Sequence, residues 1–148
     1  MNAANATLHR QVEGRLVDHG IRYTPGRRQV VAALAASDGP LSVADLSVEF
    51  EGDIPQSTIY RTISVLEEVG VVVPHLATRE MARYELAEWL TGHHHHLVCV
   101  VCGRVDDIEL ADDLERQLDE LVSTIGSTVA FRPSNHALEI DGRCPECA

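Results

Sequence analysis

The sequence has no lysine, few aromatic residues and no long apolar run. All twelve basic residues are arginine, and aromatic residues make up only 4% of the chain. No stretch approaches the roughly 18 consecutive apolar residues that a transmembrane helix needs, and the first ten residues contain no apolar segment typical of a secretory signal. These absences exclude a membrane span and predict a cytoplasmic protein. With 148 residues and 45% hydrophobic composition, the chain is expected to form one large globular domain or two small ones.

The formal net charge of -11 is distributed unevenly along the chain. Residues 1–28 hold five arginines against two acidic residues, whereas residues 87–148 hold four arginines against twelve acidic residues. Five of the eight histidines also lie at or after position 93. The basic N-terminal end therefore predicts contact with an anion, and the acidic, histidine-rich C-terminal half predicts cation binding.

The N-terminal part of the sequence has the pattern of a winged helix. Four short helices are expected, over residues 7–20, from Pro25 onward with Thr24 as N-cap, over 42–51, and from Pro55 to a stop at Gly70. Ser42 and Asp45 have the spacing of a capping box at the start of the third helix. Residues 71–73 and 83–86, with a turn near 78–80, predict a two-stranded hairpin. Helices followed by such a wing are typical of the winged helix-turn-helix, a DNA-binding fold.

The pattern changes after residues 87–92, which are expected to form a hinge. Strands are expected over 94–100 and 105–110, a helix over 111–125 and a further strand within 128–140. The predicted fold class is α+β. It consists of a winged helix-turn-helix domain (1–86), the hinge (87–92) and a small C-terminal α/β domain (93–148).

The four cysteines form two Cys-x-x-Cys pairs separated by about forty residues, at Cys99, Cys102, Cys144 and Cys147. Four thiolates in two such pairs meet the tetrahedral, soft-ligand requirement of a structural zinc ion. Two disulfides or a thioredoxin-type redox pair are the alternatives. A reducing compartment argues against the disulfides, and the missing βαβ start argues against the redox pair. Binding of structural Zn2+ is expected to supply folding free energy to the C-terminal domain.

A run of four histidines at residues 93–96 leads directly into the first cysteine pair. Successive side chains of a strand point to opposite faces, so this run can supply imidazoles to two separate metal sites. A solvated polar edge is the alternative. The expected ligands of the first, regulatory site are His75, Glu85, His94 and His96, and those of the second are His93, His95, Glu115 and His136. An ordinary exposed histidine is the alternative for His75, and a solvated helix face is the alternative for Glu115.

Together these segments resemble the ferric uptake regulator (Fur) family of metal-dependent repressors. The matching stretches, in the order of the family, are residues 22–27, 57–62, 84–86, 93–103 and 135–136. The resemblance implies a homodimer that binds palindromic operator DNA with a divalent metal as corepressor. Iron is the favoured metal, with zinc, manganese or nickel as alternatives. It also implies a phosphate contact from Arg27 and DNA contacts from Thr58, Tyr60 and Arg61 on the fourth helix, although core packing is the alternative for Tyr60.

The sequence departs from the family pattern at the expected metal ligands. Pro40 stands where many members carry a regulatory histidine, and His75 is the proposed substitute. Glu115 lies one residue further from the cysteine pair than the usual acid, so Asp112 or Asp113 could take its role.

Two further observations concern which signal is sensed. Asp107 falls where peroxide-sensing members carry an acidic ligand, but the missing histidine argues against a peroxide sensor. No cysteine precedes position 99, whereas zinc-sensing members commonly use a cysteine in the regulatory site. A nitrogen and oxygen site suits iron, manganese or nickel at least as well as zinc.

Two other classes of protein fit the sequence less well than a regulator. An enzyme is disfavoured because the sequence lacks both the His-x-Glu of zinc deaminases and the His-Glu-x-x-His of metalloproteases. A closed site of four cysteines also leaves no open zinc position for catalysis. Residues 57–61 indicate a DNA-reading helix. A zinc-ribbon interaction protein or a metal buffer would not need one.

Overall fold

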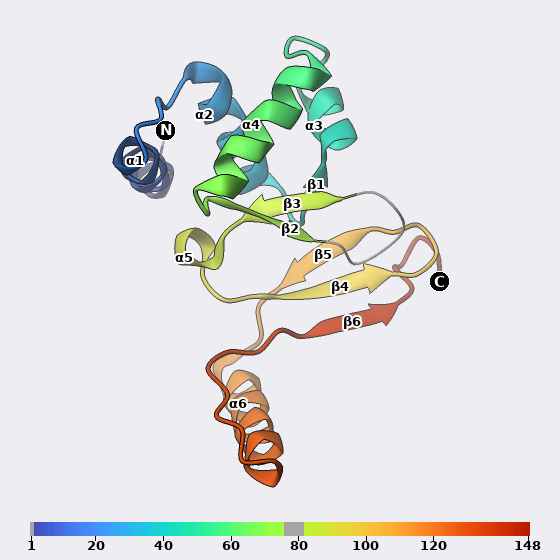
Figure 1. Cartoon of the computed structure of the whole chain (residues 1–148). Helices are drawn as coiled ribbons and strands as arrows, with labels where there is room; N and C mark the ends of the chain where they lie inside the picture. Colours follow the sequence, from blue (N-terminus) through green and yellow to red (C-terminus); the bar gives the residue numbers. More distant parts are fainter. Residues whose placement is uncertain (1, 76–81) are drawn as a thin grey trace. The chain divides into compact units, whose positions relative to one another are not determined.

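The computed structural model describes residues 2–75 and 82–148 and divides into two compact units, Met1–Gly92 and His93–Ala148 (Figure 1). The first unit combines several helices with a three-stranded sheet and the second combines one long helix with another such sheet, which confirms the α+β class. The turn expected near residues 78–80 lies outside the described residues. Among the residues that are described, no helix is both long and apolar enough to cross a membrane.

Four helices precede the hairpin in the first unit, and side chains cap the starts of the first three. Their bounds are α1 Ala3–Asp18, α2 Pro25–Ala36, α3 Val43–Glu49 and α4 Gln56–Glu68. Helix α1 begins earlier than expected because the Asn2 side chain accepts a hydrogen bond from the Asn5 N–H at 2.8 Å. Helix α2 begins as predicted, with Thr24 as its N-cap and Pro25 in its first turn.

The helices pack on a small wing sheet with strand order β1-β3-β2. Strands β2 (Val72–His75) and β3 (Arg83–Leu86) form the expected hairpin, and β1 (Leu41–Ser42) adds an unexpected third strand. The core holds side chains from every layer, including Leu16, Leu46, Ile59, Leu66 and Val72, all at most 1% exposed. Burial of each such side chain stabilises the fold by about 1.5–3 kcal/mol, so the apolar faces of α1, α3 and α4 hold the unit together.

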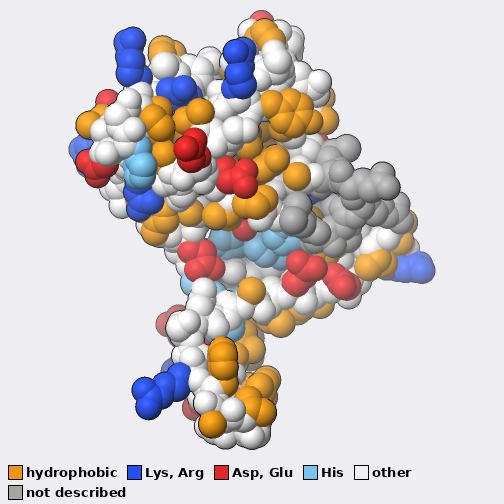
Figure 2. Space-filling model, viewed as in Figure 1, with side chains coloured by type: hydrophobic (Ala, Val, Ile, Leu, Met, Phe, Trp, Pro, Cys, Tyr) orange, Lys and Arg blue, Asp and Glu red, His pale blue; other side chains and the backbone are white. Residues whose placement is uncertain are grey.

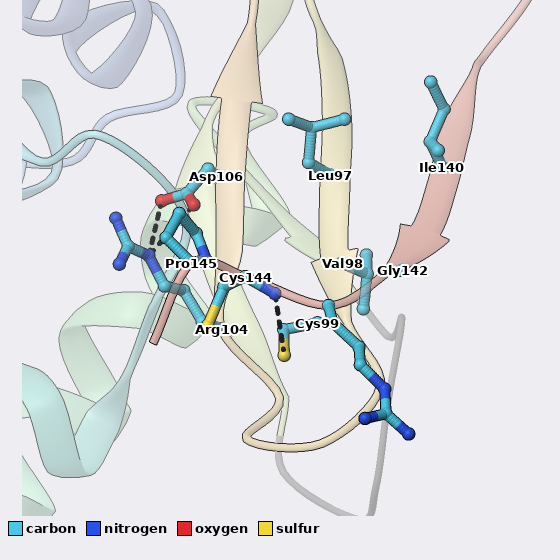
Figure 3. A pocket seen from close by; sticks show the side chains of 10 residues that line it. Leu97, Val98, Cys99, Arg104, Asp106, Ile140, Gly142, Cys144 and Pro145 are labelled. Atoms are coloured by element: carbon cyan, nitrogen blue, oxygen red, sulfur yellow. Dashed lines mark hydrogen bonds and ion pairs between the residues drawn. The ribbon is translucent and has the colours of Figure 1, made fainter. Parts of the chain in front are cut away.

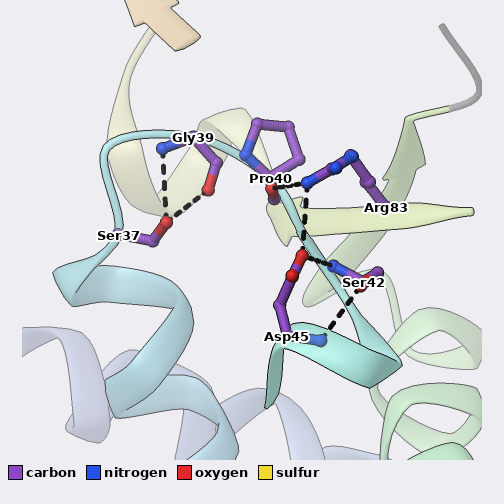
Figure 4. A network of polar contacts seen from close by, with 6 residues as sticks. All are labelled: Ser37, Gly39, Pro40, Ser42, Asp45 and Arg83. Carbon is purple, nitrogen blue, oxygen red and sulfur yellow. Dashed lines mark hydrogen bonds and ion pairs between the residues drawn. The ribbon is translucent and has the colours of Figure 1, made fainter. Parts of the chain in front are cut away.

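A capping box connects the start of α3 to the wing (Figure 4). The Asp45 N–H donates to Ser42 Oγ at 3.0 Å, and the Ser42 N–H donates to Asp45 Oδ2 at 2.9 Å. The Arg83 guanidinium, from β3, lies 3.2 Å from the same Asp45 oxygen and donates to the Pro40 carbonyl at 3.5 Å. Strand β3 is therefore tied by its side chains to the start of α3.

The expected hinge includes a short helix, α5 (Glu88–Thr91), within the first unit. The Trp89 indole N–H donates to the Gly70 carbonyl at 2.8 Å, and the Arg15 guanidinium lies 4.3 Å from the Trp89 ring centroid. Gly92 ends the unit with φ 86° and ψ 170°, a conformation essentially restricted to glycine. Any residue with a side chain would be strained in this conformation, so the chain passes into the second unit at a position that requires glycine.

The second unit is a sheet with order β5-β4-β6 and one long helix. Strand β4 (His95–Cys99) pairs antiparallel with β5 (Val105–Ile108) and parallel with β6 (Glu139–Gly142). Helix α6 (Asp112–Thr128) extends away from the sheet (Figure 1), and hydrophobic side chains lie exposed along it (Figure 2). Leu114, Leu121 and Ile125 are each about half exposed, so the single chain leaves the apolar face of α6 uncovered.

Candidate metal centres and DNA-binding surface

The four cysteines come together at one end of the second sheet. One ligand atom from each lies within 4.8 Å of all the others, and Cys102 Sγ is 3.8 Å from Cys144 Sγ. Tight turns hold both pairs, because the Gly103 N–H donates to the Cys99 carbonyl and the Cys147 N–H donates to the Cys144 carbonyl, each at 2.9 Å. All four thiols are free, so the structure contains no disulfide among them. This four-cysteine cluster has the composition of a structural zinc site.

Electrostatics at this cluster favour a thiolate at Cys99. Backbone N–H groups of Cys102 and Cys144 lower the pKa of the Cys99 thiol to about 6, and the Cys144 N–H lies 3.4 Å from the Cys99 sulfur (Figure 3). The neighbouring Cys144 thiol has the opposite effect on Cys147 and raises its pKa. Because zinc binds thiolates, the backbone around Cys99 prepares the first ligand for the metal.

A cavity of about 250 Å3 adjoins the four-cysteine cluster and is lined by residues that include Leu97, Ile140 and Cys144 (Figure 3). Arg104 and Asp106 also line it, and the Arg104 side chain donates to Asp106 Oδ1 at 3.0 Å. The arginine is thus held by a neighbouring carboxylate. Apolar surface of β4 and β6 forms most of the cavity lining.

A second cluster contains the four residues expected for the second metal site, His93, His95, Glu115 and His136. The Glu115 carboxylate lies at its centre, with nitrogens of the three histidines between 2.9 and 3.2 Å from its oxygens. The hydrogen bond from His95 lowers the pKa of the Glu115 carboxyl and keeps it ionised. The ligand atoms of these three imidazoles and one carboxylate all lie within 4.8 Å of one another, so the group can hold a divalent cation of the first transition row. Asp112 and Asp113 are not part of this cluster.

Three elements position these side chains. Strand β4 supplies His95, the residue pair before it supplies His93, and the first turn of α6 supplies Glu115. His136 was expected in the last strand, but it lies in the segment between α6 and β6. That segment folds back along α6 because Ala130 adopts φ 54° and Gly126 permits close approach of the backbone.

A third group lies on the other face of β4. His94 and His96 face the Asp107 carboxylate at 3.8 and 3.4 Å, and their rings meet edge to face at 5.1 Å between centroids. Asp107 was not among the expected ligands of the regulatory site. The register of β4 and β5, which pairs His96 directly with Asp107, is the signal that places it there.

The other two expected ligands of the regulatory site, His75 and Glu85, lie in the wing of the first unit. His75 pairs with Arg83 across the hairpin, and Glu85 pairs with Val73. Residues directly opposite, and residues two apart along a strand, share one face of a sheet. His75 and Glu85 are therefore diagonal neighbours on the same face of the wing, opposite the face that packs on the core.

The residues expected to contact DNA lie on α4 and at the start of α2. Tyr60 is 55% exposed, which argues against core packing, and the exposed Arg61 donates to Thr58 Oγ1 at 3.5 Å. The Arg27 guanidinium donates to the Arg22 carbonyl at 2.5 Å. Arginine side chains project from the part of the first unit formed by α1, α2 and α4 (Figure 2).

A partly buried hydrogen bond fixes the segment that leads into α2. The Tyr23 hydroxyl lies 2.6 Å from His9 Nδ1, and the Arg28 guanidinium lies 4.5 Å from the Tyr23 ring centroid. Burial lowers the pKa of His9 and raises the pKa of Tyr23 to about 12, so the imidazole and the phenol are both neutral where they share this hydrogen bond. The basic start of α2 is thereby attached to α1.

The winged helix and the second unit, rich in cysteine and histidine, together define a metal-binding regulator of the winged helix-turn-helix type. The model of the ferric uptake regulator family matches residues 18–140, and the chain belongs to this family.

Individual relatives agree with this assignment. The ferric uptake regulation protein of Legionella pneumophila is 31% identical, with 90% of this chain and 96% of that protein covered. The peroxide operon regulator of Bacillus subtilis (strain 168) is 29% identical, with coverage of 90% and 88%. A solved zinc-bound manganese uptake regulator superposes with a TM-score of 0.69 at 28% identity, covering 90% of this chain and 98% of that one. The relatives thus include regulators named for different signals.

Proposed function

We propose that this chain is a metal-responsive transcriptional repressor that binds palindromic operator DNA as a cytoplasmic homodimer, with iron as the favoured effector. Residues 1–86 form the DNA-binding domain, 87–92 the hinge and 93–148 the metal-binding dimerisation domain. A zinc-, manganese- or nickel-responsive member is the alternative. Membership in a family of transcriptional regulators supports a role other than catalysis.

The observation that carries this proposal is the distribution of histidines around β4. Alternate histidines of residues 93–96 face two different sets of carboxylates, one from α6 and one from β5. A solvated polar edge would leave these imidazoles exposed, but His95 is 1% exposed. Two separate groups of nitrogen and oxygen ligands beside a four-cysteine cluster fit one structural ion and two exchangeable ions.

The regulatory site we propose consists of His75, Glu85, His94 and His96, with Asp107 as an additional acidic ligand. A divalent cation bound there supplies positive charge that offsets the carboxylates. Since the wing carries two of these residues and the second unit carries the others, one ion couples both units across residues 87–92. That coupling orients the two winged helices of a dimer for one operator.

DNA contact is assigned to exposed and partly exposed polar residues of the first unit. Tyr60 and Arg61, with Thr58 beside them, reach into the major groove from α4, and Arg27 contacts a phosphate. The apolar face of α6 supports homodimer formation, because half-exposed Leu114, Leu121 and Ile125 require a covering surface.

An equilibrium DNA-binding titration tests the proposal. The duplexes are inverted repeats selected from random sequence by the metal-loaded protein. The protein carries one equivalent of zinc, and Fe2+, Mn2+, Ni2+ or further Zn2+ is added in turn. We expect one ion to increase the affinity by about tenfold or more, a coupling of about 1.4 kcal/mol.

One variant and its control distinguish the loss of a ligand at the regulatory site from the general effect of removing a histidine. His96→Ala should abolish the metal-dependent gain, whereas His19→Ala should retain it, because His19 lies exposed at the end of α1, outside the three clusters. DNA binding that no metal changes would contradict the corepressor mechanism.

A peroxide response is the second candidate function, favoured by the position of Asp107 against His94 and His96. A relative named as a peroxide operon regulator supports it as well. The distinguishing experiment exposes the Fe2+-loaded and Mn2+-loaded proteins to hydrogen peroxide. Loss of DNA binding by the Fe2+ form alone supports a peroxide sensor, and equal retention by both forms excludes it.

A further inference from the structure

The His136 imidazole lies between two carboxylates of helix α6. Its Nε2 is 2.9 Å from Glu115 Oε1, and its Nδ1 is 3.4 Å from Asp119 Oδ1. Glu115 and Asp119 are four residues apart, so they share one face of the helix. Each ring nitrogen of His136 therefore faces its own acidic partner.

The two carboxylates lie at different depths. The side chain of Glu115 is 25% exposed, whereas that of Asp119 is 63% exposed, and His136 itself is 14% exposed. Glu115 also contacts His93 and His95. The cluster of candidate ligands that contains Glu115 does not include Asp119. Asp119 thus stands outside the cluster, behind the histidine.

The chemistry of imidazole gives this outer position a specific role. A neutral imidazole carries one N–H, and the nitrogen that binds a cation must be the other one. When Nε2 of His136 faces the cluster, the proton is on Nδ1, the nitrogen that lies 3.4 Å from Asp119 Oδ1. A carboxylate that accepts this proton fixes the tautomer, fixes the ring orientation and makes the ligand more basic.

His95 provides the contrast within the same cluster. Its Nδ1 is buried and has no hydrogen-bond partner among the described residues. The acidic partner at Nδ1 of His136 is therefore not a feature that every histidine of the cluster shares.

We propose that Asp119 is a positioning residue for the second metal site, which orients His136 through Nδ1 without binding the ion itself. This inference rests on the proposed function, because it requires that His93, His95, Glu115 and His136 bind a divalent cation. Asp119 then sets the affinity of this site from outside it.

The test measures Co2+ affinity by absorption spectroscopy of the full-length protein with zinc already bound. A His96→Ala background removes the contribution of the regulatory site. In this background Asp119→Ala should weaken Co2+ binding by about 10- to 100-fold. Asp119→Asn, which keeps the Oδ1 acceptor, should restore most of the affinity. Glu120→Ala removes the same charge from the next residue of α6 and should have little effect.

The outcomes distinguish failure of the positioning role of Asp119 from failure of the second metal site itself. If Asp119→Ala and Glu120→Ala weaken binding equally, the effect is long-range charge and the inference is overturned. If Asp119→Asn binds as weakly as Asp119→Ala, acceptance at Nδ1 is not the cause and the inference is also overturned. If His136→Ala leaves Co2+ binding unchanged, the cluster is not a metal site, and the second-site part of the proposed function fails with it.

Discussion

Replacing Gly126 with alanine tests whether the return of the chain along α6 builds the second metal site. Gly126 is the buried residue of α6, and a Cβ added there would lie 2.6 Å from the Phe131 carbonyl oxygen and 2.7 Å from the Pro133 ring. The oxygen belongs to the backbone and cannot rotate away. Residues 131–133 must therefore move, and His136 follows them by three residues.

Two opposing terms set the magnitude. Alanine is favoured over glycine within a helix by up to about 1 kcal/mol. Overpacking against a backbone atom and a proline ring costs about 1–3 kcal/mol. The net effect on the free energy of unfolding is a destabilisation of about 0–2 kcal/mol. The metal site is more sensitive, since a binding constellation must hold its geometry to within about 0.5 Å. We therefore expect an at least tenfold loss of affinity at the second site.

Denaturant unfolding and Co2+ titration of the same variant measure the two effects. Gly14→Ala is the matched control, because Gly14 lies within α1 and nothing comes within 4 Å of an added Cβ. It should stabilise the protein by about 0.5–1 kcal/mol and leave the Co2+ affinity unchanged. If Gly126→Ala behaves like Gly14→Ala in both measurements, the close approach does not constrain the site.

Three further results are expected. Cys144→Ser should abolish binding of the structural zinc equivalent, measured by metal analysis after dialysis, and should lower the melting temperature; retention of one tightly bound zinc per chain would contradict the four-cysteine site. Ser42→Ala should lower the free energy of unfolding by about 1 kcal/mol through loss of the cap to Asp45, and an unchanged value would show that the capping box contributes nothing. The lowered pKa of His9 means that its contribution to stability is complete above pH 6.5 and is lost as the pH falls toward its folded-state pKa. His9→Gln should flatten the unfolding free energy in that window, and an identical pH profile would exclude His9 as its source.

Local sequence signals predicted those parts of the fold that depend on nearest neighbours. Thr24 with Pro25 marked the start of α2, and Ser42 with Asp45 marked the start of α3, because a cap is satisfied within one turn. Strand β1 and helix α5 gave no such signal. A two-residue strand forms through pairing with β3, and α5 is held by the contact of Trp89 with a carbonyl 19 residues away. Their existence depends on contacts that periodicity does not contain.

The same distinction applies to the metal clusters. The alternation of side chains in a strand predicted that the histidine run serves two faces, and the structure groups His93 and His95 apart from His94 and His96. The acidic partners required more than alternation. Asp107 joins the second pair through strand register, and Asp119 reaches His136 only because the chain folds back along α6. Neither register nor chain reversal can be read from spacing alone.

The attachment of α5 also provides a built-in optical reporter. Trp89 is the single tryptophan of the chain, and its indole is hydrogen-bonded just beyond the end of α4 and lies against a guanidinium. Intrinsic emission excited at the red edge of protein absorption therefore comes from one position, next to the residues that lead into the metal-binding unit. Rearrangement at that position changes the emission wavelength or its quenching, without any attached label.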